Sequence, residues 1–282
     1  MRAERLTDAV AEHAEGPVWS QGWGGLRWVD MHAGDVLSLA PDGGVGRRHV
    51  GAVAAALRPR SRGGAVIAVE RRFVLEDGDG GLTALGELWP AGMRLRMNEG
   101  GCDPDGRFYC GSMHYDQEPG AAALHRLEPG GTVVTVLGGL TISNGLDWSP
   151  DGTLAYYVDT ATNRVDVFDY AGGELRARRP FARVPREAGH PDGLAVDAEG
   201  GVWVALYDGG AVRRYGPGGE LDAVVEVGAR KVTACAFGGD GLRELFITTS
   251  REGLAAGEDP AAGSLFRAMP GVSGRPVREF AG

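Results

Sequence analysis

Four polar residues with oxygen-bearing side chains could together bind a hard metal ion. Each of them lies beside glycine or near the start of an apolar run. They are Glu15 in EGPVW, Asn98 in RMNEGGCDPDGR, Asn144 in SNGLDWSPDG and Asp192 in HPDGLAVD. The oxygen atoms of Glu, Asp and Asn are the ligands that Ca²⁺, Mg²⁺ and Mn²⁺ prefer in proteins. Each motif alone is also an ordinary turn sequence. The prediction of a metal site therefore depends on where the four motifs fall along the chain.

Other common catalytic patterns are absent from the sequence. It contains no GxSxG nucleophile motif, no HExxH zinc motif, no Walker loop and no GxGxxG sequence that opens a helix. The six histidines form no short-range ligand pair, and the three cysteines include no CxxC pair. Neither a zinc knuckle nor a disulfide framework is expected.

The segments around the four polar residues belong to a repeat. A short apolar run, a turn with Asp or Pro and Gly, and an alternating run recur as CDPDGRFYCGSM, DWSPDGTLAYYVDT and VDAEGGVWVALYDGG. Each copy is typical of a β-hairpin, because the turn residues tolerate positive φ and the flanking residues alternate with period two. A helical period is hard to find anywhere in the chain.

The spacing of the repeats predicts the fold. The polar residues and the equivalent Thr233 are separated by 83, 46, 48 and 41 residues, and the first gap accommodates two units, with the missing one starting near Ala54. Six units of about 47 residues fill the 282 residues and predict an all-β, six-bladed β-propeller as a single domain over 1–282. A two-sheet sandwich would not explain this period. We expect RLTDAV from Arg5 to close the last blade beside GSLFRAMP from Gly263.

A propeller would bring the four polar residues together. The first strand of each blade lines the central channel, and these strands start at the same mouth. Two carboxylates and two amides in a partly dehydrated mouth would be costly unless a cation compensated them. The fold prediction therefore makes a divalent metal site as good an explanation of the four residues as four ordinary turns.

Composition limits the classes of partner. With 29 Lys and Arg against 38 Asp and Glu the formal charge is 29 − 38 = −9, which argues against a nucleic acid or an anionic membrane surface. No apolar stretch approaches the roughly 18 residues of a membrane helix, and the start of the chain has no apolar signal region. A cytoplasmic protein that acts on a small molecule is expected, and the sequence carries no signal for its oligomeric state.

The motifs resemble a known family. EGPVW, RMNEGGCDPDGRFYCGSM, SNGLDWSPDGTLAYYVDT, HPDGLAVDAEGGVWVALYDGG and KVTACAFGGDGLRELFITTS look like the successive blade motifs of the senescence marker protein/gluconolactonase/luciferin-regenerating enzyme (regucalcin-like) family. The resemblance runs in the family's order from about Glu15 to Ser250. It implies a six-bladed propeller with one divalent metal ion, whether Ca²⁺, Zn²⁺, Mg²⁺ or Mn²⁺, at the channel mouth.

The resemblance also implies roles for individual residues. The metal ligands would be Glu15, Asn144 and Asp192, while Asn98 would contribute to the metal or to the substrate. Arg96 matches a substrate-contacting arginine. Glu99 stands where sugar-lactone members usually carry Asp, so it would reach the substrate with an arm one methylene longer.

The implied activity is hydrolysis of a lactone, most often an aldonolactone such as gluconolactone. The metal would polarise the carbonyl or activate water, with Asp192 as ligand and as general base and acid. Arg96, Asn98 and Glu99 would hold sugar hydroxyls. Two alternatives stay open, because the fold alone does not decide function. One is a hydrolase of another activated ester, such as a phosphotriester, and the other is a non-catalytic propeller that binds a metal.

Overall fold

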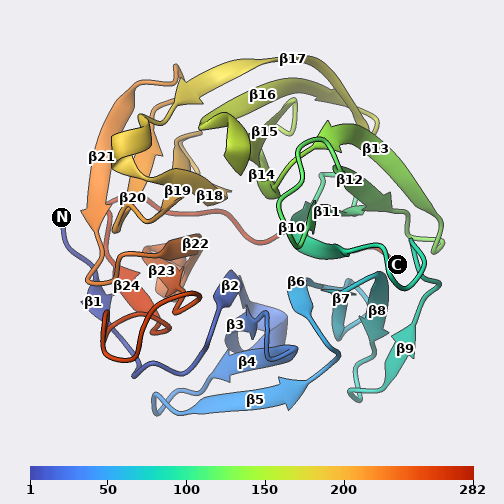
Figure 1. Cartoon of the computed structure of the whole chain (residues 1–282), viewed down its shortest axis with the longest axis horizontal. Helices are drawn as coiled ribbons and strands as arrows, with labels where there is room; N and C mark the ends of the chain where they lie inside the picture. The colour runs from blue at the N-terminus through green and yellow to red at the C-terminus, as the bar shows by residue number, and fades with distance from the viewer.

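Six four-stranded antiparallel sheets stand around a common axis in the computed structural model, which describes residues Met1–Gly282 (Figure 1). Each sheet is one blade, and five of the six are built from four strands that follow one another along the chain. The six-bladed β-propeller predicted from the repeat spacing is confirmed.

The innermost strand of each blade faces the axis. These strands are β2 (Ala14–Ser20), β6 (Ala54–Pro59), β10 (Leu95–Cys102), β14 (Ser143–Trp148), β18 (His190–Val196) and β22 (Val232–Gly238). The second and third strands of the blades are β3 (Gly25–Asp30), β4 (Asp35–Leu39), β7 (Ala65–Val69), β8 (Arg72–Glu76), β11 (Phe108–His114), β12 (Ala122–Leu127), β15 (Leu154–Asp159), β16 (Arg164–Ala171), β19 (Val202–Tyr207), β20 (Ala211–Tyr215), β23 (Glu244–Thr249) and β24 (Phe266–Ala268).

The outermost strands are the most exposed. They are β5 (Val45–His49), β9 (Leu82–Ala84), β13 (Val133–Leu140), β17 (Glu174–Arg183), β21 (Leu221–Glu226) and β1 (Glu4–Arg5). Helical structure is confined to four single 3₁₀ turns, η1 (Gln21–Trp23), η2 (Thr160–Thr162), η3 (Arg186–Ala188) and η4 (Asp240–Leu242). None of them has the length and apolar character that a membrane crossing requires.

The Asp-Gly turns of the repeat connect inner strands to their neighbours. Between β18 and β19, the fully buried Asp197 accepts hydrogen bonds from the backbone N–H groups of Glu199 and Gly201, at 2.9 and 2.8 Å. The same carboxylate accepts bonds from Trp203 Nε1 at 2.9 Å and Arg214 Nε at 2.7 Å. One side chain therefore fixes the turn and ties it to the next two strands, since buried carboxylates need such partners.

The apolar core lies between adjacent blades. One cluster joins Val158 and Val165 of the fourth blade to Val196 and Val204 of the fifth, and all four are buried. β-Branched side chains suit this packing, because they fit closely against the pleated surface of the neighbouring sheet. Side-chain packing therefore joins the blades, and hydrogen bonds such as that from Val196 N–H to Asp147 add to it.

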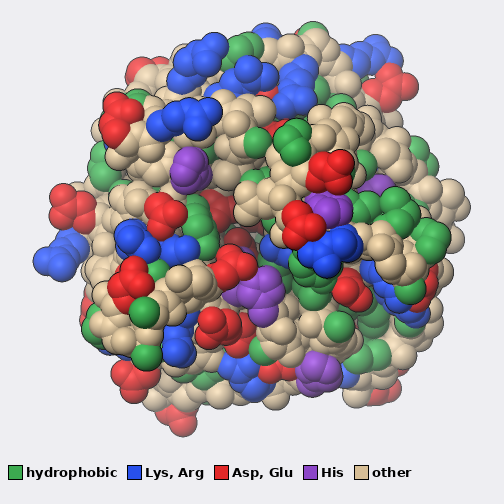
Figure 2. Space-filling model, viewed as in Figure 1, with side chains coloured by type: hydrophobic (Ala, Val, Ile, Leu, Met, Phe, Trp, Pro, Cys, Tyr) green, Lys and Arg blue, Asp and Glu red, His purple; other side chains and the backbone are tan.

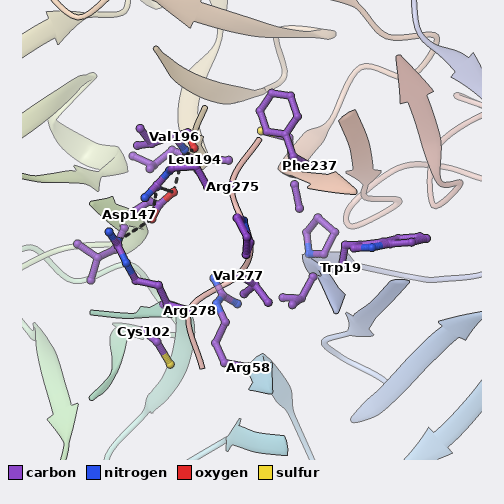
Figure 3. A pocket seen from close by; sticks show the side chains of 18 residues that line it. Trp19, Arg58, Cys102, Asp147, Leu194, Val196, Phe237, Arg275, Val277 and Arg278 are labelled. Carbon is purple, nitrogen blue, oxygen red and sulfur yellow. Dashed lines mark hydrogen bonds and ion pairs between the residues drawn. The ribbon is translucent and has the colours of Figure 1, made fainter. Parts of the chain in front are cut away.

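The end of the chain crosses one mouth of the channel. The backbone N–H groups of Phe280 and Ala281 donate to Pro59 O and Gly106 O, at 2.8 and 2.9 Å. Figure 3 shows Arg275 pointing to Asp147, with Nη2 and Oδ2 3.2 Å apart, beside a cavity of about 90 Å³. This cavity is lined by the C-terminal halves of inner strands. The opposite mouth, where those strands begin, is the one that the polar residues share.

The N-terminal segment lies against the last blade. Strand β1 pairs with β24 through Glu4 opposite Arg267 and Arg5 opposite Phe266. After Arg5 the segment leaves strand geometry but still bonds to the same blade, from Leu6 N–H to Leu265 O at 2.8 Å. These contacts join the first part of the chain to the last.

Deleting residues 1–10 should lower the melting temperature by about 4–8 °C. The deletion removes several backbone hydrogen bonds, together worth about 2 kcal/mol, and one kcal/mol moves Tm by about 2–4 °C in a chain of this size. Thermal unfolding followed by circular dichroism measures the change. Asp8→Ala is the matched control, because this side chain is fully exposed and should leave Tm unchanged. An unchanged Tm in the deletion would contradict the closure.

Candidate metal and substrate site

The polar residues predicted to meet lie at irregularities of the inner strands. In every inner strand the ladder register shifts, and the shift falls at Asn98, Asn144 and Asp192 and directly after Glu15. A β-bulge of this kind re-aims a side chain relative to a regular strand. The same irregularity in each blade therefore turns these side chains to the same mouth.

Glycine next to these residues lets the inner strands approach one another. A Cβ atom on Gly145 would lie 2.6 Å from the backbone nitrogen of Leu194 and 2.8 Å from the carbonyl oxygen of Asp192. Any larger residue would push β14 and β18 apart. The Asn-Gly motif therefore allows the inner strands to pack closely around the channel, and it also forms the bulge in β14.

A cavity of about 520 Å³ opens at this mouth. Its size is within the range of pockets for small molecules. Figure 2 shows a hollow at the centre of this face, surrounded by acidic, basic and histidine side chains. The predicted site residues in its lining are Glu15, Arg96, Asn98, Asn144 and Asp192, and the wall and rim include Met113, Gln117, Pro119, Thr160, Arg186, His190, Tyr207 and Glu252.

A hydrogen-bonded chain orients the deepest part of the cavity. Asn144 Nδ2 donates to Asp192 Oδ1 and to Thr160 Oγ1, the latter at 3.0 Å. The Thr160 hydroxyl in turn donates to Pro191 O at 2.9 Å. Both donor hydrogens of the Asn144 amide are thereby used, so its oxygen is turned toward the remaining space.

Three carboxyl groups share this buried region. Burial raises the pKa of Glu15 to about 7. Burial, with the nearby charges of Glu15 and Glu99, raises the pKa of Asp192 well above its usual range. Burial and the charge of Glu15 do the same to Glu99. Without a cation the site therefore favours protonated carboxyls.

The donor set fits a divalent metal ion. Asn144 Oδ1 and Glu99 Oε2 are buried and have no hydrogen-bond partner in the structure. Buried polar atoms without partners are rare in folded proteins and point to a missing ligand. Carboxylate and amide oxygens at the same place match the all-oxygen preference of a hard cation. Glu15, Asn144 and Asp192 are the residues that would hold it.

Arg96 and Asn98 form a separate pair in the wall of the cavity. Arg96 Nη1 donates to Asn98 Oδ1 at 2.6 Å, to Met97 O at 3.1 Å and to Met31 Sδ at 2.9 Å. Asn98 Nδ2 donates to Ser143 O at 2.9 Å. Burial lowers the pKa of Arg96 below its ordinary value. The Nε and Nη2 atoms of Arg96 make no bond within the chain, so they are available to a ligand.

Glu99 is placed differently from the other predicted residues. It is adjacent to Asn98 in the bulge of β10 and is buried, but it does not line the cavity. Its Oε1 lies 2.9 Å from where a Cβ on Gly193 would be. The structure therefore groups Glu99 with the carboxyls of Glu15 and Asp192, beneath the surface that a substrate would touch.

The sequence motifs did not identify several residues in the wall of the cavity. Thr160, Tyr207 and Glu252 lie at or just after the ends of the second strands of their blades, and the repeat motifs gave none of them a role. Their positions in the repeat could have identified them, because the second strand of a blade ends at the same mouth of the channel at which the inner strand begins. His13 could have been found in the same way, because it directly precedes β2.

Comparison with known proteins gives consistent matches along the whole chain. The profile of the SMP-30/Gluconolactonase/LRE-like region matches residues 13–251. Regucalcin of Danio rerio is 35% identical, over 100% of this chain and 99% of its own. The structure of a calcium-binding protein, regucalcin, from Agrobacterium tumefaciens superposes with a TM-score of 0.93 at 28% identity, covering 99% and 97% of the two chains. A gluconolactonase from Xanthomonas campestris superposes with a TM-score of 0.77 at 25% identity, covering 93% and 87%.

Chelator-treated protein should lose stability as the pH rises from about 5 to about 8. Glu15 and Asp192 have a higher pKa folded than unfolded, so over this range the unfolded chain has released protons that the folded chain still holds. The free energy of unfolding therefore falls with rising pH, and added Ca²⁺ should restore it at the upper end. Thermal unfolding at each pH, with and without Ca²⁺, measures both effects.

Glu15→Gln is the control for this prediction. The variant cannot ionise at this position, so its chelated form should depend less on pH than the unmodified chain. Equal stability of the chelated protein at both ends of the pH range would contradict the electrostatic account.

Proposed function

Because the chain belongs to the SMP-30/gluconolactonase/LRE-like family, we propose that it is a divalent-metal-dependent hydrolase that opens a lactone ring. Family membership supports lactonase activity, and we propose an aldonolactone such as gluconolactone as the substrate. The observation that carries the proposal is the buried cluster of Glu15, Asn144 and Asp192, with the Asn144 oxygen unpartnered, at the floor of the cavity.

Different residues around the cavity can carry out different steps of the hydrolysis. A bound divalent cation supplies Lewis acidity, which favours attack by water on a carbonyl at neutral pH. Asp192 accepts a proton from the attacking water and returns it to the ring oxygen when the ester C–O bond breaks. The product is the open-chain hydroxy acid. The hydrogen bond from Asn144 holds the Asp192 carboxylate in place for both transfers.

Arg96 and Asn98 would position the substrate. The free guanidinium nitrogens of Arg96 can donate to ring hydroxyls, while the bond to Asn98 fixes the direction in which they point. Holding the lactone in one orientation lowers the entropic cost of reaching the transition state. We assign Glu99 to the charge of the cation site, because it lies below the cavity lining.

Turnover of a panel of aldonolactones, followed by proton release, tests the proposed activity. Chelator-stripped protein should be inactive. Ca²⁺, Zn²⁺, Mg²⁺ or Mn²⁺, each added back separately, should restore activity to different extents and so rank the metals. Folded protein that turns over no lactone with any of these metals would overturn the proposal. An activated ester such as a phosphotriester is then the next substrate to try, and failure there would leave a metal-binding propeller.

Asp192→Ala should lower kcat/KM by at least about 100-fold, within the usual range for a lost proton-transfer group. The measurement is steady-state hydrolysis of the best lactone in saturating metal. Asp240→Ala is the matched control, since this carboxylate is fully exposed on η4 and should leave turnover unchanged. Near-normal turnover by Asp192→Ala would remove Asp192 from the mechanism.

A further inference from the structure

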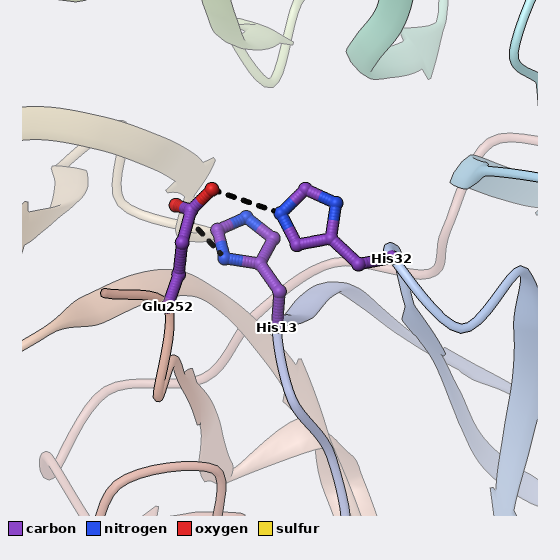
Figure 4. Close-up of side chains that lie close together, drawn as sticks. All are labelled: His13, His32 and Glu252. Atoms are coloured by element: carbon purple, nitrogen blue, oxygen red, sulfur yellow. Dashed lines mark hydrogen bonds and ion pairs between the residues drawn. The ribbon is translucent and has the colours of Figure 1, made fainter. Parts of the chain in front are cut away.

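Two histidines and one glutamate from distant parts of the chain meet at the wall of the cavity (Figure 4). His13 directly precedes β2, His32 lies in the turn between β3 and β4, and Glu252 follows β23. Their metal-ligating atoms all lie within 4.8 Å of one another. None of the three is among the residues that would hold the cation at the floor of the cavity.

The Glu252 carboxylate contacts both imidazole rings (Figure 4). Its Oε1 is 2.9 Å from His32 Nε2, and its Oε2 is 3.6 Å from His13 Nδ1. The rings are themselves adjacent, with centroids 4.8 Å apart and planes at 33°. Two imidazole nitrogens and a carboxylate thus converge on one small volume.

We propose that His13, His32 and Glu252 form a second metal site that binds a first-row transition-metal dication such as Zn²⁺. Two imidazoles with one carboxylate are an established ligand set for zinc, whose tetrahedral geometry leaves a fourth position for water or substrate. Imidazole nitrogen suits Zn²⁺, whereas oxygen-only sites suit Ca²⁺ and Mg²⁺. The donor atoms of the two sites therefore differ in the ions that they prefer.

The two separations between the carboxylate and the imidazoles are close to what tetrahedral zinc requires, and the two imidazole nitrogens lie within 4.8 Å of each other. Bonds of about 2.0–2.2 Å place ligand atoms about 3.4 Å apart. The two carboxylate-to-imidazole separations, 2.9 and 3.6 Å, lie on either side of that value. Small rotations of exposed side chains would suffice, because His32 and Glu252 are 29% and 45% exposed while His13 is buried.

A metal bound to His13 Nδ1 and His32 Nε2 would replace the hydrogen bonds that these nitrogens make with Ser250 and Glu252. Ser250 Oγ is 2.7 Å from His13 Nδ1, and it also accepts a hydrogen bond from Glu252 N–H at 3.0 Å, which it keeps if Nδ1 binds a metal. The hydrogen bond with His32 lowers the pKa of Glu252 to about 2, so the carboxylate is ionised at neutral pH. Metal ligands must be in such deprotonated forms.

The position of the cluster links it to the cavity. His13 and Glu252 both line the cavity, so an ion bound between them would lie in its wall. The other nitrogen of His13, Nε2, is 3.9 Å from Glu15 Oε1. His13 therefore lies between the proposed second site and Glu15, one of the residues that would hold the cation at the floor of the cavity.

Cobalt(II) chloride added to Ca²⁺-saturated protein tests the proposal. Saturation with Ca²⁺ occupies the oxygen site, and tetrahedral Co²⁺ with nitrogen ligands absorbs visible light far more strongly than six-coordinate Co²⁺ with oxygen ligands. We expect one Co²⁺ per chain with strong visible bands, which Zn²⁺ displaces. The readout does not depend on turnover, so it stands whether or not the lactonase proposal fails.

His32→Ala and Glu252→Gln should abolish the bands and weaken Co²⁺ binding by at least about 100-fold, the upper end of what a lost outer-sphere partner costs. His49→Ala is the matched control, because its ring is 69% exposed and lies outside the cluster, so it should keep the bands. Circular dichroism verifies that each variant is folded. Absence of strong bands in the unmodified protein, or their survival in His32→Ala, would overturn the proposal and leave the cluster as a hydrogen-bonded ion pair.

Discussion

Glu15, Asp192 and Glu99 bring three carboxyl groups into one buried region. Burial raises the pKa of all three, and the charge of Glu15 raises the pKa of Asp192 and of Glu99 further. Like charges without water are costly, so the region is stable with protons or with a cation in place. The unpartnered oxygen of Asn144 adds a ligand and no charge. These buried carboxyl groups underlie the proposal of a metal site, and they are the reason that metal binding and proton uptake are expected to compete.

The propeller makes such a cluster possible by repetition. Each inner strand carries a register shift near its start, so six positions face one mouth of the channel. Four of them hold acidic or amide side chains, while Ala55 and Thr233 occupy the other two. The cavity is therefore asymmetric, with carboxylate and amide oxygens on some blades and Arg96 in the wall of another. The function depends on which side chains occupy these equivalent positions, because the propeller fold by itself supports many different activities.

Much of this architecture could be predicted from the sequence, since Gly-containing motifs mark the inner strands at near-constant spacing. The start of the second blade is the least evident from the sequence, because Ala55 stands where the other blades carry a polar side chain. The walls of the cavity could not be predicted. His32 and Glu252 reach His13 through a hairpin turn and through the meeting of the first and last blades, and their sequence separations match no ligand pattern. The family resemblance implies a substrate contact for Glu99, and the structure has this residue buried in the bulge of β10, outside the set of residues that line the cavity.

The central claim is that the buried carboxyls at the channel mouth bind a divalent cation in exchange for protons. Calorimetric titration of Ca²⁺ into chelator-treated protein at about pH 6.5, in two buffers of different ionisation enthalpy, measures affinity, stoichiometry and proton release together. The account predicts one Ca²⁺ per chain with net release of protons, and loss of binding in Asp192→Asn. Binding without proton release, or binding that survives in Asp192→Asn, would contradict it.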